Sequence, residues 1–498
     1  MKKISRREFL STSSAFLAFS AIAGKQALAK NRKKPNVLFI AVDDLRVQLN
    51  CYGKKEIKSP NIDSLANDGV LFKHAYCQQA VCNPSRASLL TGMRPDTCKV
   101  WDLHTHFRDT VPDVKTLPQW FKENGYVSVG LGKIYHGNLL DPESWSEPFD
   151  LVLSDKYVDP ENVKKIEEQT KAALAKGLKG KALRVAKHGP AFEHPDVPDD
   201  AYSDGKIAKK SINLLRKLAK GKKPFFLAVG FKKPHLPFNA PKKYWDMYDE
   251  NKIKLADNPF LPEGAPKLAR TSWGELRAFK GIPKKGPVPD ELAKKLIHGY
   301  YACVSYIDAQ IGKLIKELKR LKLYDNTIIV LWGDHGWKLG EHGMWAKHTN
   351  FELDANAPLI VKAPGTKKGV KSNALVEFVD IYPTLCDLAG LKKPEHLEGY
   401  SFYSLLKNPK LKWKKAAFSQ YPRQKGRIMG YSVRTERYRY TEWIVRKTGK
   451  IKARELYDHL KDDKENVNVV NKPEYKEVVK KLHKILHDGW RKAVPPVE

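Results

Sequence analysis

The segment 36–44 reads Asn-Val-Leu-Phe-Ile-Ala-Val-Asp-Asp, an apolar run that ends in two adjacent aspartates. The apolar residues occupy successive positions, which is typical of a strand buried on both faces of a mostly parallel sheet. Three later apolar runs are closely followed by polar residues in the same way: 126–131, 224–229 and 327–332. Because ligands bind beyond the carboxyl ends of parallel strands, these four segments predict a functional site at one edge of a sheet.

Helical patterns lie between the apolar runs. Residues 115–124 and 206–219 have amphipathic spacing, and residues 292–323 carry a longer amphipathic pattern that fits one helix or two. Alternating strands and helices imply crossover connections and an α/β fold. Residues 163–188 are rich in Lys and Ala and show no strand pattern, so we interpret them as a solvated helical insertion rather than a substrate-facing one.

The composition changes near residue 410. Residues 430–443 are aromatic, polar and partly alternating, which predicts an antiparallel hairpin with its turn near 435–437. Residues 473–490 have a helical pattern. A chain of 498 residues with 42% hydrophobic residues can bury a large core, so we predict a catalytic domain over 34–409 and a smaller α+β subdomain over 410–498.

The first 29 residues have the features of an export signal. Ser5-Arg-Arg-Glu-Phe-Leu10 is a twin-arginine pattern, a Ser- and Ala-rich stretch follows, and Ala27-Leu-Ala29 is a small-x-small cleavage site. The apolar stretch is too short and too polar for a stable membrane span. We therefore predict a signal peptide over 1–29, export by the twin-arginine machinery, and a mature protein in the periplasm or secreted.

The charge of the chain is strongly positive. Lys and Arg number 90 against 56 Asp and Glu, which gives a formal net charge of +34. Such a charge favours an anionic partner, which could be nucleic acid, anionic lipid or acidic polysaccharide. A basic proteome or habitat is an alternative explanation of the charge. No recognised nucleic-acid-binding motif is present in the sequence, so a nucleic-acid partner is not expected.

The segment 82–92, Cys-Asn-Pro-Ser-Arg-Ala-Ser-Leu-Leu-Thr-Gly, combines a thiol with an anion-binding pattern. Proline two residues after Cys82 and a closing Gly92 predict a short helix that begins at the cysteine. Amide N–H groups and the helix dipole at that end favour an anion, and Arg86 adds a guanidinium suited to a tetrahedral oxyanion. A lone cysteine at such a junction is more often a structural residue than a catalytic one. The spacing of the whole motif is therefore needed to distinguish the two roles.

The pattern C-x-P-x-R-x-x-x-L-T-G resembles the signature of the type I sulfatases, and the resemblance extends over nearly the whole mature chain. It implies an alkaline-phosphatase-like fold with a large mixed, mostly parallel sheet flanked by helices. It also implies sulfate ester hydrolysis by a formylglycine made from Cys82, which requires a formylglycine-generating or radical maturation enzyme as a partner.

Carboxylates at the strand ends suggest a metal site. Asp43 and Asp44 adjoin each other and would repel unless a cation lies between them, although a solvated loop pair is an alternative. Asp334 follows another strand, and hard oxygen ligands suit Ca²⁺ or Mg²⁺. The resemblance implies Ca²⁺ at five residues: Asp43, Asp44, Cys82, Asp334 and His335. Most sulfatases have Asn where this chain has His335, and that departure matches the iduronate-2-sulfatase branch, as does the run 336–347.

Basic residues follow the same strands. Each alone fits a surface position, but together they match family positions that form a sulfate cage: Lys133, His136, His235 and Lys347. With Cys82 and Arg86 they make up the predicted catalytic set. The resemblance implies that His235 or Lys347 protonates the leaving alcohol and that His136 acts as a base when sulfate is expelled.

Residues close to these motifs are candidates for substrate recognition. His104, His106 and Arg108 follow the signature, and an exposed polar loop explains them equally well. Trp337 suits stacking on a sugar ring or packing in the core.

The expected reaction is sulfate release from a sulfated polysaccharide or oligosaccharide, with 2-O-sulfated uronate as the leading substrate. Two alternatives stay open. One is a phosphonate or phosphate ester hydrolase with the same signature, and the other is a non-catalytic protein that binds sulfated glycans.

Overall fold

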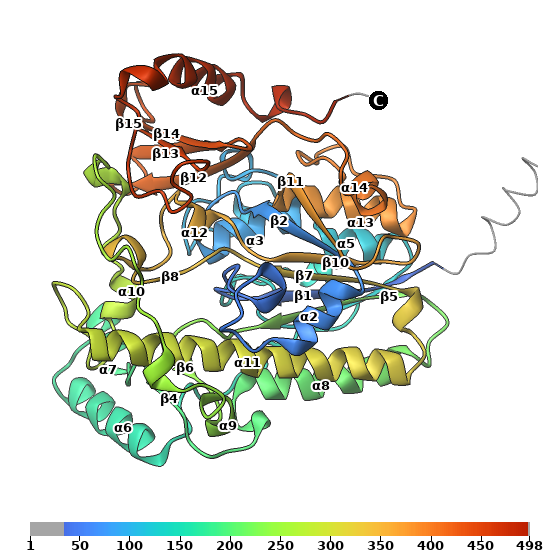
Figure 1. Cartoon of the computed structure of the whole chain (residues 1–498). Helices are drawn as coiled ribbons and strands as arrows, with labels where there is room; N and C mark the ends of the chain where they lie inside the picture. The colour runs from blue at the N-terminus through green and yellow to red at the C-terminus, as the bar shows by residue number, and fades with distance from the viewer. Residues whose placement is uncertain (1–33, 497–498) are drawn as a thin grey trace, which may run out of the picture. The chain divides into compact units, whose positions relative to one another are not determined.

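Seven strands form the central sheet, in the order β11-β2-β10-β7-β1-β5-β3 (Figure 1). Their bounds are β1 Asn36–Val42, β2 Val70–Tyr76, β3 Val127–Gly132, β5 Phe225–Phe231, β7 Thr327–Gly333, β10 Leu359–Lys362 and β11 Val370–Glu377. Strand β10 runs antiparallel to β2 and β7, and the other neighbours pair in parallel. The four predicted strands are therefore confirmed, in a mixed and mostly parallel sheet.

The computed structural model describes residues 34–496, and the predicted signal peptide over 1–29 lies outside the described residues. Residues from Asn36 onward form one compact unit. No helix in the described part of the chain is both long and apolar enough to cross a membrane.

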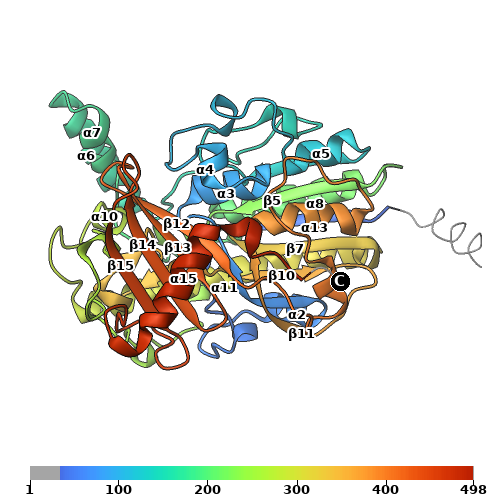
Figure 2. The same ribbon diagram turned by 90° about the horizontal axis from the view of Figure 1, so that it is seen from above.

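Helices cover both faces of the central sheet (Figures 1 and 2). Alternate residues of β1 point to opposite faces: Leu38 and Ile40 pack in one core with α2, α8 and α11, whereas Val37 and Phe39 pack in another with α3, α5 and α13. The bounds of these helices are α2 Pro60–Asn67, α3 Cys82–Thr91, α5 Leu117–Glu123, α8 Ser203–Leu218, α11 Asp290–Arg320 and α13 Ile381–Ala389. The long pattern over 292–323 is thus a single helix of 31 residues.

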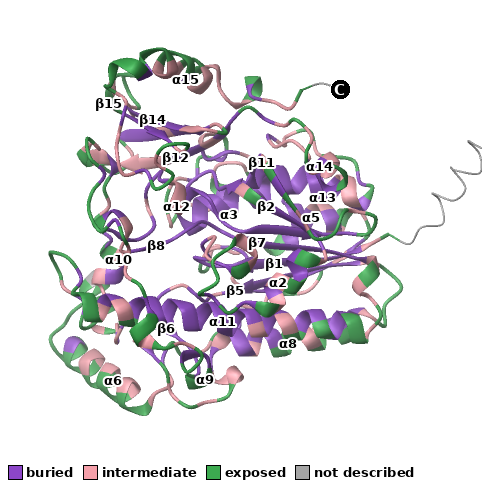
Figure 3. Cartoon of the chain, viewed as in Figure 1, coloured by how far each residue is buried: buried purple, intermediate pink, exposed green. Residues whose placement is uncertain are grey.

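The predicted helical insertion is present as two helices, α6 Pro160–Ala175 and α7 Gly180–Ala186. Figure 3 shows that α6 is mostly exposed, unlike the strands of the central sheet. Short elements connect the larger ones: α4 Pro95–Cys98, β4 Phe192–Glu193, β6 Phe238–Asn239, α9 Lys242–Trp245, α10 Gly274–Arg277, β8 Lys338–Leu339, β9 Trp345–Ala346, α12 Glu352–Ala355 and α14 Tyr403–Lys407.

A second, antiparallel sheet follows, with strands in sequence order and helix α15 over one face (Figure 2). Its elements are β12 Ala417–Arg423, β13 Ile428–Arg434, β14 Tyr438–Val445, β15 Ile451–Asp458 and α15 Lys476–Asp488. The predicted hairpin is confirmed, since β13 and β14 pair across a turn at 435–437. This sheet adjoins the larger one, where the Gln420 N–H donates to the Gln78 carbonyl over 2.8 Å. The domain boundary between 409 and 410 stays a prediction.

Two glycines let the end of β3 approach β5 closely. Gly132 has φ +76°, and a Cβ there would lie 2.1 Å from the Gly230 carbonyl oxygen. A Cβ on Gly230 would in turn lie 2.2 Å from the backbone of Lys133. Neither position accepts a side chain without backbone movement. This contact fixes where Lys133 leaves the sheet, because its N–H donates to the Gly230 carbonyl over 2.8 Å.

All six cysteines are free thiols: Cys51, Cys77, Cys82, Cys98, Cys303 and Cys386. The stability of the fold therefore depends on packing, hydrogen bonds and ion pairs, with no contribution from disulfides.

Candidate active site

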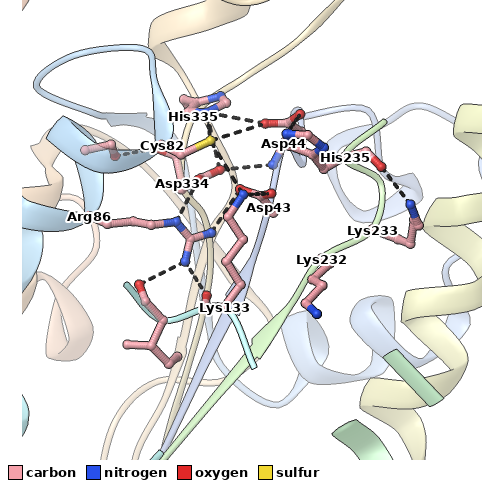
Figure 4. Close-up of polar contacts among 12 residues, drawn as sticks. Asp43, Asp44, Cys82, Arg86, Lys133, Lys232, Lys233, His235, Asp334 and His335 are labelled. Carbon is pink, nitrogen blue, oxygen red and sulfur yellow. Dashed lines mark hydrogen bonds and ion pairs between the residues drawn. The ribbon is translucent and has the colours of Figure 1, made fainter. Parts of the chain in front are cut away.

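The polar residues predicted at the strand ends do converge at one edge of the sheet (Figure 4). Asp43 and Asp44 follow β1, and Asp334 and His335 follow the neighbouring strand β7. The Asp44 N–H donates to Asp334 Oδ1 over 3.0 Å, which ties the two strand ends together. Asp44 has φ +59°, so the chain turns sharply between the two adjacent carboxylates and both enter the site.

Cys82 is the first residue of α3, as predicted, and Gly92 ends the helix in the left-handed conformation. Every residue of α3 is buried, and Cys82 is only 2% exposed. Its Sγ lies 3.4 Å from His335 Nε2 and 3.8 Å from Lys133 Nζ. Burial, followed by the charge of Asp43, raises the pKa of the Cys82 thiol well above its usual value. An unmodified thiol in this place is therefore un-ionised and a poor nucleophile.

Arg86, on α3, bridges two of the carboxylates. Its Nε donates to Asp334 Oδ2 over 2.9 Å, and Nη2 donates to Asp43 Oδ1 over 3.1 Å. The third nitrogen, Nη1, donates to the Ile134 carbonyl over 3.0 Å. The guanidinium is fully buried, so it is a fixed structural charge that sets the positions of two carboxylates.

Two lysines pair with the aspartates. Lys133 Nζ donates to Asp43, and Lys347 Nζ lies 2.9 and 3.0 Å from the oxygens of Asp44. Burial acts to raise the pKa of Asp43, but Lys133 and then His235 and Arg86 hold it well below the usual range. Burial raises the pKa of Asp44 despite the opposing effect of Lys347. Asp44 thus carries an unfavourable buried charge that a further cation would stabilise.

The donor set fits a divalent cation. The ligand atoms of Asp43, Asp44, Cys82 and His235 lie within 4.8 Å of one another, as do those of Cys82, Asp334 and His335. The site contains four carboxylates, including that of Glu275, and three fixed cations. Counted without the histidines, these groups carry one net negative charge. The members of this count are Asp43, Asp44, Asp334 and Glu275 against Arg86, Lys133 and Lys347. Buried carboxylate oxygens in this number are typical ligands of Ca²⁺ or Mg²⁺.

Glu275 is a site residue that the sequence did not reveal. It lies on the short helix α10, and its carboxylate contacts His235 Nε2 at 2.9 Å and Lys347 Nζ at 3.0 Å. Burial acts to raise the pKa of Glu275, but Lys347 and His235 outweigh it and hold the pKa well below the usual range. The residue comes from a segment without strand pattern or motif, so no spacing signal pointed to it.

His136 lies in the electrostatic field of Lys133, Asp43 and Arg86, and among the described residues it forms no hydrogen bond with Cys82. Its Nδ1 is buried and has no hydrogen-bond partner in the described part of the chain. Burial, followed by repulsion from Lys133, lowers the pKa of His136 to about 3. The imidazole is therefore neutral and carries a free lone pair for proton transfer.

Arg108 is held by contacts within its own region of the chain, which do not support the predicted role in substrate recognition. Its guanidinium binds Asp141 through Nε at 2.9 Å and also contacts the carbonyls of Pro112 and Val114. These contacts stabilise the surrounding loop. His106 Nε2 likewise donates to the Leu140 carbonyl over 2.9 Å and its Nδ1 accepts from the Arg108 N–H over 3.0 Å, whereas His104 is exposed.

Trp337 is a packing residue, so the prediction that it stacks on a sugar ring is wrong. It is 1% exposed and packs edge-on against Phe238 with ring centroids 6.2 Å apart. Lys347 Nζ lies 4.7 Å from its ring centroid. The indole thus supports the lysine from behind, as a cation–π partner in a desolvated place.

Comparison with known families agrees with this geometry. Residues 35–391 match the family model described as Sulfatase. The chain belongs to the sulfatase family. Residues 340–492 match the model described as N-sulphoglucosamine sulphohydrolase, C-terminal. The protein is therefore a sulfuric ester hydrolase.

Curated relatives place this sulfatase in the iduronate-2-sulfatase-like branch. Iduronate 2-sulfatase of Homo sapiens is 37% identical over 480 residues, covering 82% of this chain and 85% of the relative. A sulfatase of Formosa agariphila is 32% identical over 483 residues, covering 93% and 88%. Both resemblances extend well beyond the signature at Cys82.

Solved structures share the fold. One, in complex with its substrate D-glucosamine-2-N,6-O-disulfate, has a TM-score of 0.73 at 25% identity and covers 93% of this chain and 98% of that chain. The phosphonate monoester hydrolase from Silicibacter pomeroyi has a TM-score of 0.72 at 22% identity, covering 93% and 96%, and shows the common fold alone. The predicted alkaline-phosphatase-like fold class is confirmed.

Replacing Glu275 with glutamine is expected to lower kcat of this sulfatase by about 10- to 100-fold, as for other groups that orient a site residue. The amide keeps the shape but removes the charge that holds His235 and Lys347 in place. Glu250→Gln is the matched control, since Glu250 pairs with His298 at 3.5 Å outside the site. Steady-state kinetics should show the loss in the first variant alone, and equal kcat values for both variants would contradict the positioning role.

Proposed function

We propose that this sulfatase uses a formylglycine at position 82 and a bound Ca²⁺ ion to hydrolyse sulfate esters of an anionic oligosaccharide, with 2-O-sulfated uronate as the preferred residue. The observation that carries the proposal is the meeting of Cys82 with three buried carboxylates and three fixed cations at one sheet edge. Similarity to iduronate 2-sulfatase over most of the chain supports the choice of sugar.

Two groups supply chemistry that the encoded side chains lack. Formylglycine presents a hydrated aldehyde, with one hydroxyl to attack sulfur and a second whose deprotonation releases sulfate. Asp43, Asp44, Asp334 and His335 would hold a divalent cation, which would supply positive charge to the sulfuryl oxygens. With that cation the four carboxylates and three fixed cations, counted without the histidines, would carry one net positive charge, which suits an anionic sulfate ester.

The fixed cations bind and orient the ester. Lys133 pairs with Asp43, and Lys347 pairs with Asp44. Their ammonium groups neutralise charge that develops on sulfuryl oxygens in the transition state. Arg86 stays bound to Asp43 and Asp334, so its role is to keep two metal-binding carboxylates in place and residue 82 in a positive field.

Proton transfers fall to the histidines. His235 Nδ1 lies 2.7 Å from the Leu236 carbonyl and Nε2 lies 2.9 Å from Glu275, so both ring nitrogens are oriented. Its side chain is 29% exposed and can reach a leaving alcohol, with Lys347 as the alternative donor. His136 would hold the complementary role of a base toward the group at position 82, because its imidazole is neutral.

The sugar specificity is tested with matched disaccharides. Sulfate release should be faster from 2-O-sulfated uronate disaccharides than from 6-O-sulfated hexosamine disaccharides, measured as kcat/KM by ion chromatography. A Cys82→Ala preparation serves as the blank for contaminating sulfatases. Preference for the hexosamine compounds would overturn the uronate assignment and leave the sulfatase activity intact.

A second substrate class has its own support. The structure that binds D-glucosamine-2-N,6-O-disulfate is 25% identical to this chain, so a sulfated glucosamine is the second candidate. The phosphonate hydrolases share only the fold at 22–24% identity and carry no argument about substrate. The net charge of +34 favours a polyanionic substrate in both cases.

Export and maturation complete the proposal. The twin-arginine pattern in residues 1–29 supports export to the periplasm or beyond by the twin-arginine machinery. The signature around Cys82 supports a formylglycine-generating or radical maturation enzyme as the partner that modifies it.

A further inference from the structure

Three metal-binding side chains meet in the C-terminal part of the chain, away from Cys82. Glu442 lies on β14, and His483 and His487 lie on α15, which packs over that sheet (Figure 2). The two histidines are four residues apart on the helix, so they occupy the same face one turn from each other. Neither the signature motif nor the catalytic set includes any of the three.

The geometry brings the donor atoms together. His483 Nδ1 lies 2.7 Å from Glu442 Oε1, and His487 Nε2 lies 2.8 Å from Glu442 Oε2. All three ligand atoms lie within 4.8 Å of one another, and the imidazole rings are 4.2 Å apart between centroids. Each carboxylate oxygen thus lies within hydrogen-bond distance of one imidazole nitrogen. Small rotations of the two histidine side chains would make room for an ion between these atoms.

We propose that Glu442, His483 and His487 form a second metal site, which takes a borderline transition-metal ion of the Zn²⁺ class. Two imidazoles and one carboxylate are a common ligand set for zinc, and i, i+4 histidines on one helix face are a recurring way to supply it. Imidazole-rich sites disfavour Ca²⁺ and Mg²⁺, which prefer oxygen ligands. The site is therefore chemically distinct from the oxygen-rich site at Asp43.

Burial and access both suit an ion. The Glu442 carboxylate is fully buried, whereas the side chains of His483 and His487 are 44% and 47% exposed. His487 also borders a cavity of about 330 Å³, next to Trp490 and Tyr431. An ion can enter from solvent, and water can fill the fourth coordination position.

The groups around Glu442 support a ligand role. The Tyr440 hydroxyl donates to Glu442 Oε1 over 2.6 Å, which orients the carboxylate as an outer-shell partner. Arg454, its cross-strand neighbour on β15, reaches the same oxygen only at 3.4 Å and is 45% exposed. Solvent screens that positive charge, so it weakens binding of a cation without excluding it.

A second cluster of similar composition is less suited to a metal ion. Glu352, His459 and Glu465 also lie close together, but Arg439 Nε binds Glu465 at 2.7 Å and Arg434 Nε binds Glu352 at 3.0 Å. Two guanidinium groups already supply the positive charge there. At Glu442 the close partners are two imidazoles, and the one guanidinium, that of Arg454, is 45% exposed and 3.4 Å away.

A bound ion would fasten α15 to the sheet. Leu482 is the only fully buried residue of this helix, and Val478, Val479, Ile485 and Leu486 are partly buried against the same core. Coordination of His483 and His487 to a strand residue adds a link that depends on metal concentration. Binding to the folded state alone raises the melting temperature in proportion to the logarithm of the free ion concentration.

The test counts Zn²⁺ on the full mature chain by equilibrium dialysis and elemental analysis. Wild-type protein should bind one equivalent more than the His483→Gln/His487→Gln variant, and Glu442→Gln should weaken binding at least about tenfold, since loss of even outer-shell partners costs that much. Counting the difference removes any zinc held at the active site. Sulfatase activity and circular dichroism of the variants should match wild type.

A second measurement needs no variant. Zn²⁺ should protect His483 and His487 of wild-type protein from diethylpyrocarbonate, as read by peptide mass spectrometry, and should raise the melting temperature. Equal zinc content in wild type and the double-histidine variant, or unprotected histidines at saturating Zn²⁺, would overturn the second site. Neither result bears on the activity proposed for Cys82.

Discussion

Alanine in place of Cys82 is expected to lower kcat for sulfate release by about 10⁴-fold or more, as for removal of other covalent nucleophiles. The buried thiol is held un-ionised by burial and by Asp43, so its own reactivity is not what the site uses. The loss arises because alanine cannot become an aldehyde that hydrates and attacks sulfur. Substrate binding through Lys133 and Lys347 should persist, so ligand affinity should fall far less than kcat.

The chemical state of residue 82 is read directly by mass spectrometry. Trypsin releases residues 74–86, a peptide that contains both Cys77 and Cys82. Fragment ions should place the aldehyde at position 82 and an unmodified thiol at position 77, so one peptide carries its own control. Cys386→Ala, at a buried cysteine on α13, should keep full activity. A fully active preparation with only cysteine at position 82 would refute the mechanism.

The Asp43→Asn variant should lose metal affinity and at least about 100-fold in kcat, beyond the range typical of outer-shell residues. The amide removes one of the buried charges that attract the cation, and it leaves Arg86 and Lys133 without their shared partner. Breaking a buried ion pair in this way costs about 3–5 kcal/mol of folding free energy. Chelation of wild-type protein should reproduce the loss of activity without a mutation, and Ca²⁺ should restore it.

A variant at a carboxylate outside the site distinguishes loss of metal binding from loss of folding stability. Asp141→Asn removes a buried partner of Arg108 outside the site, so it should lower the melting temperature and leave metal content unchanged. Elemental analysis is best made on the His483→Gln/His487→Gln variant, which reports the active-site ion alone. If this variant were active with zinc as its only metal, the calcium assignment would be wrong.

The strands and the signature were predictable because their patterns are local. Apolar runs such as 36–42 mark buried strands, and parallel pairing then forces Asp43 and Asp334 to one edge. The helix at Cys82 followed from its proline and its closing glycine. In each case a short stretch of sequence carries the physical constraint, so tertiary contacts were not needed to infer it.

Other site features depend on contacts between distant segments. Glu275 reaches His235 and Lys347 from the short helix α10, in a segment whose sequence has no periodic pattern. Arg108 and Trp337 have residue types that suit ligand recognition, yet the tertiary fold uses one to hold a loop and the other to pack behind a lysine. Residue type states what a side chain can bind, and only its neighbours decide whether it is free to do so.

The burial of α3 limits when Cys82 can be modified. Once the ten residues from Cys82 to Thr91 are surrounded, a maturation enzyme has no physical route to the thiol. The proposed oxidation must then happen on a nascent or open chain, in competition with the folding rate. Under the proposed mechanism, a molecule that folds before oxidation keeps an unmodified thiol and stays inactive, so the active fraction of a preparation would depend on the rate of oxidation relative to the rate of folding.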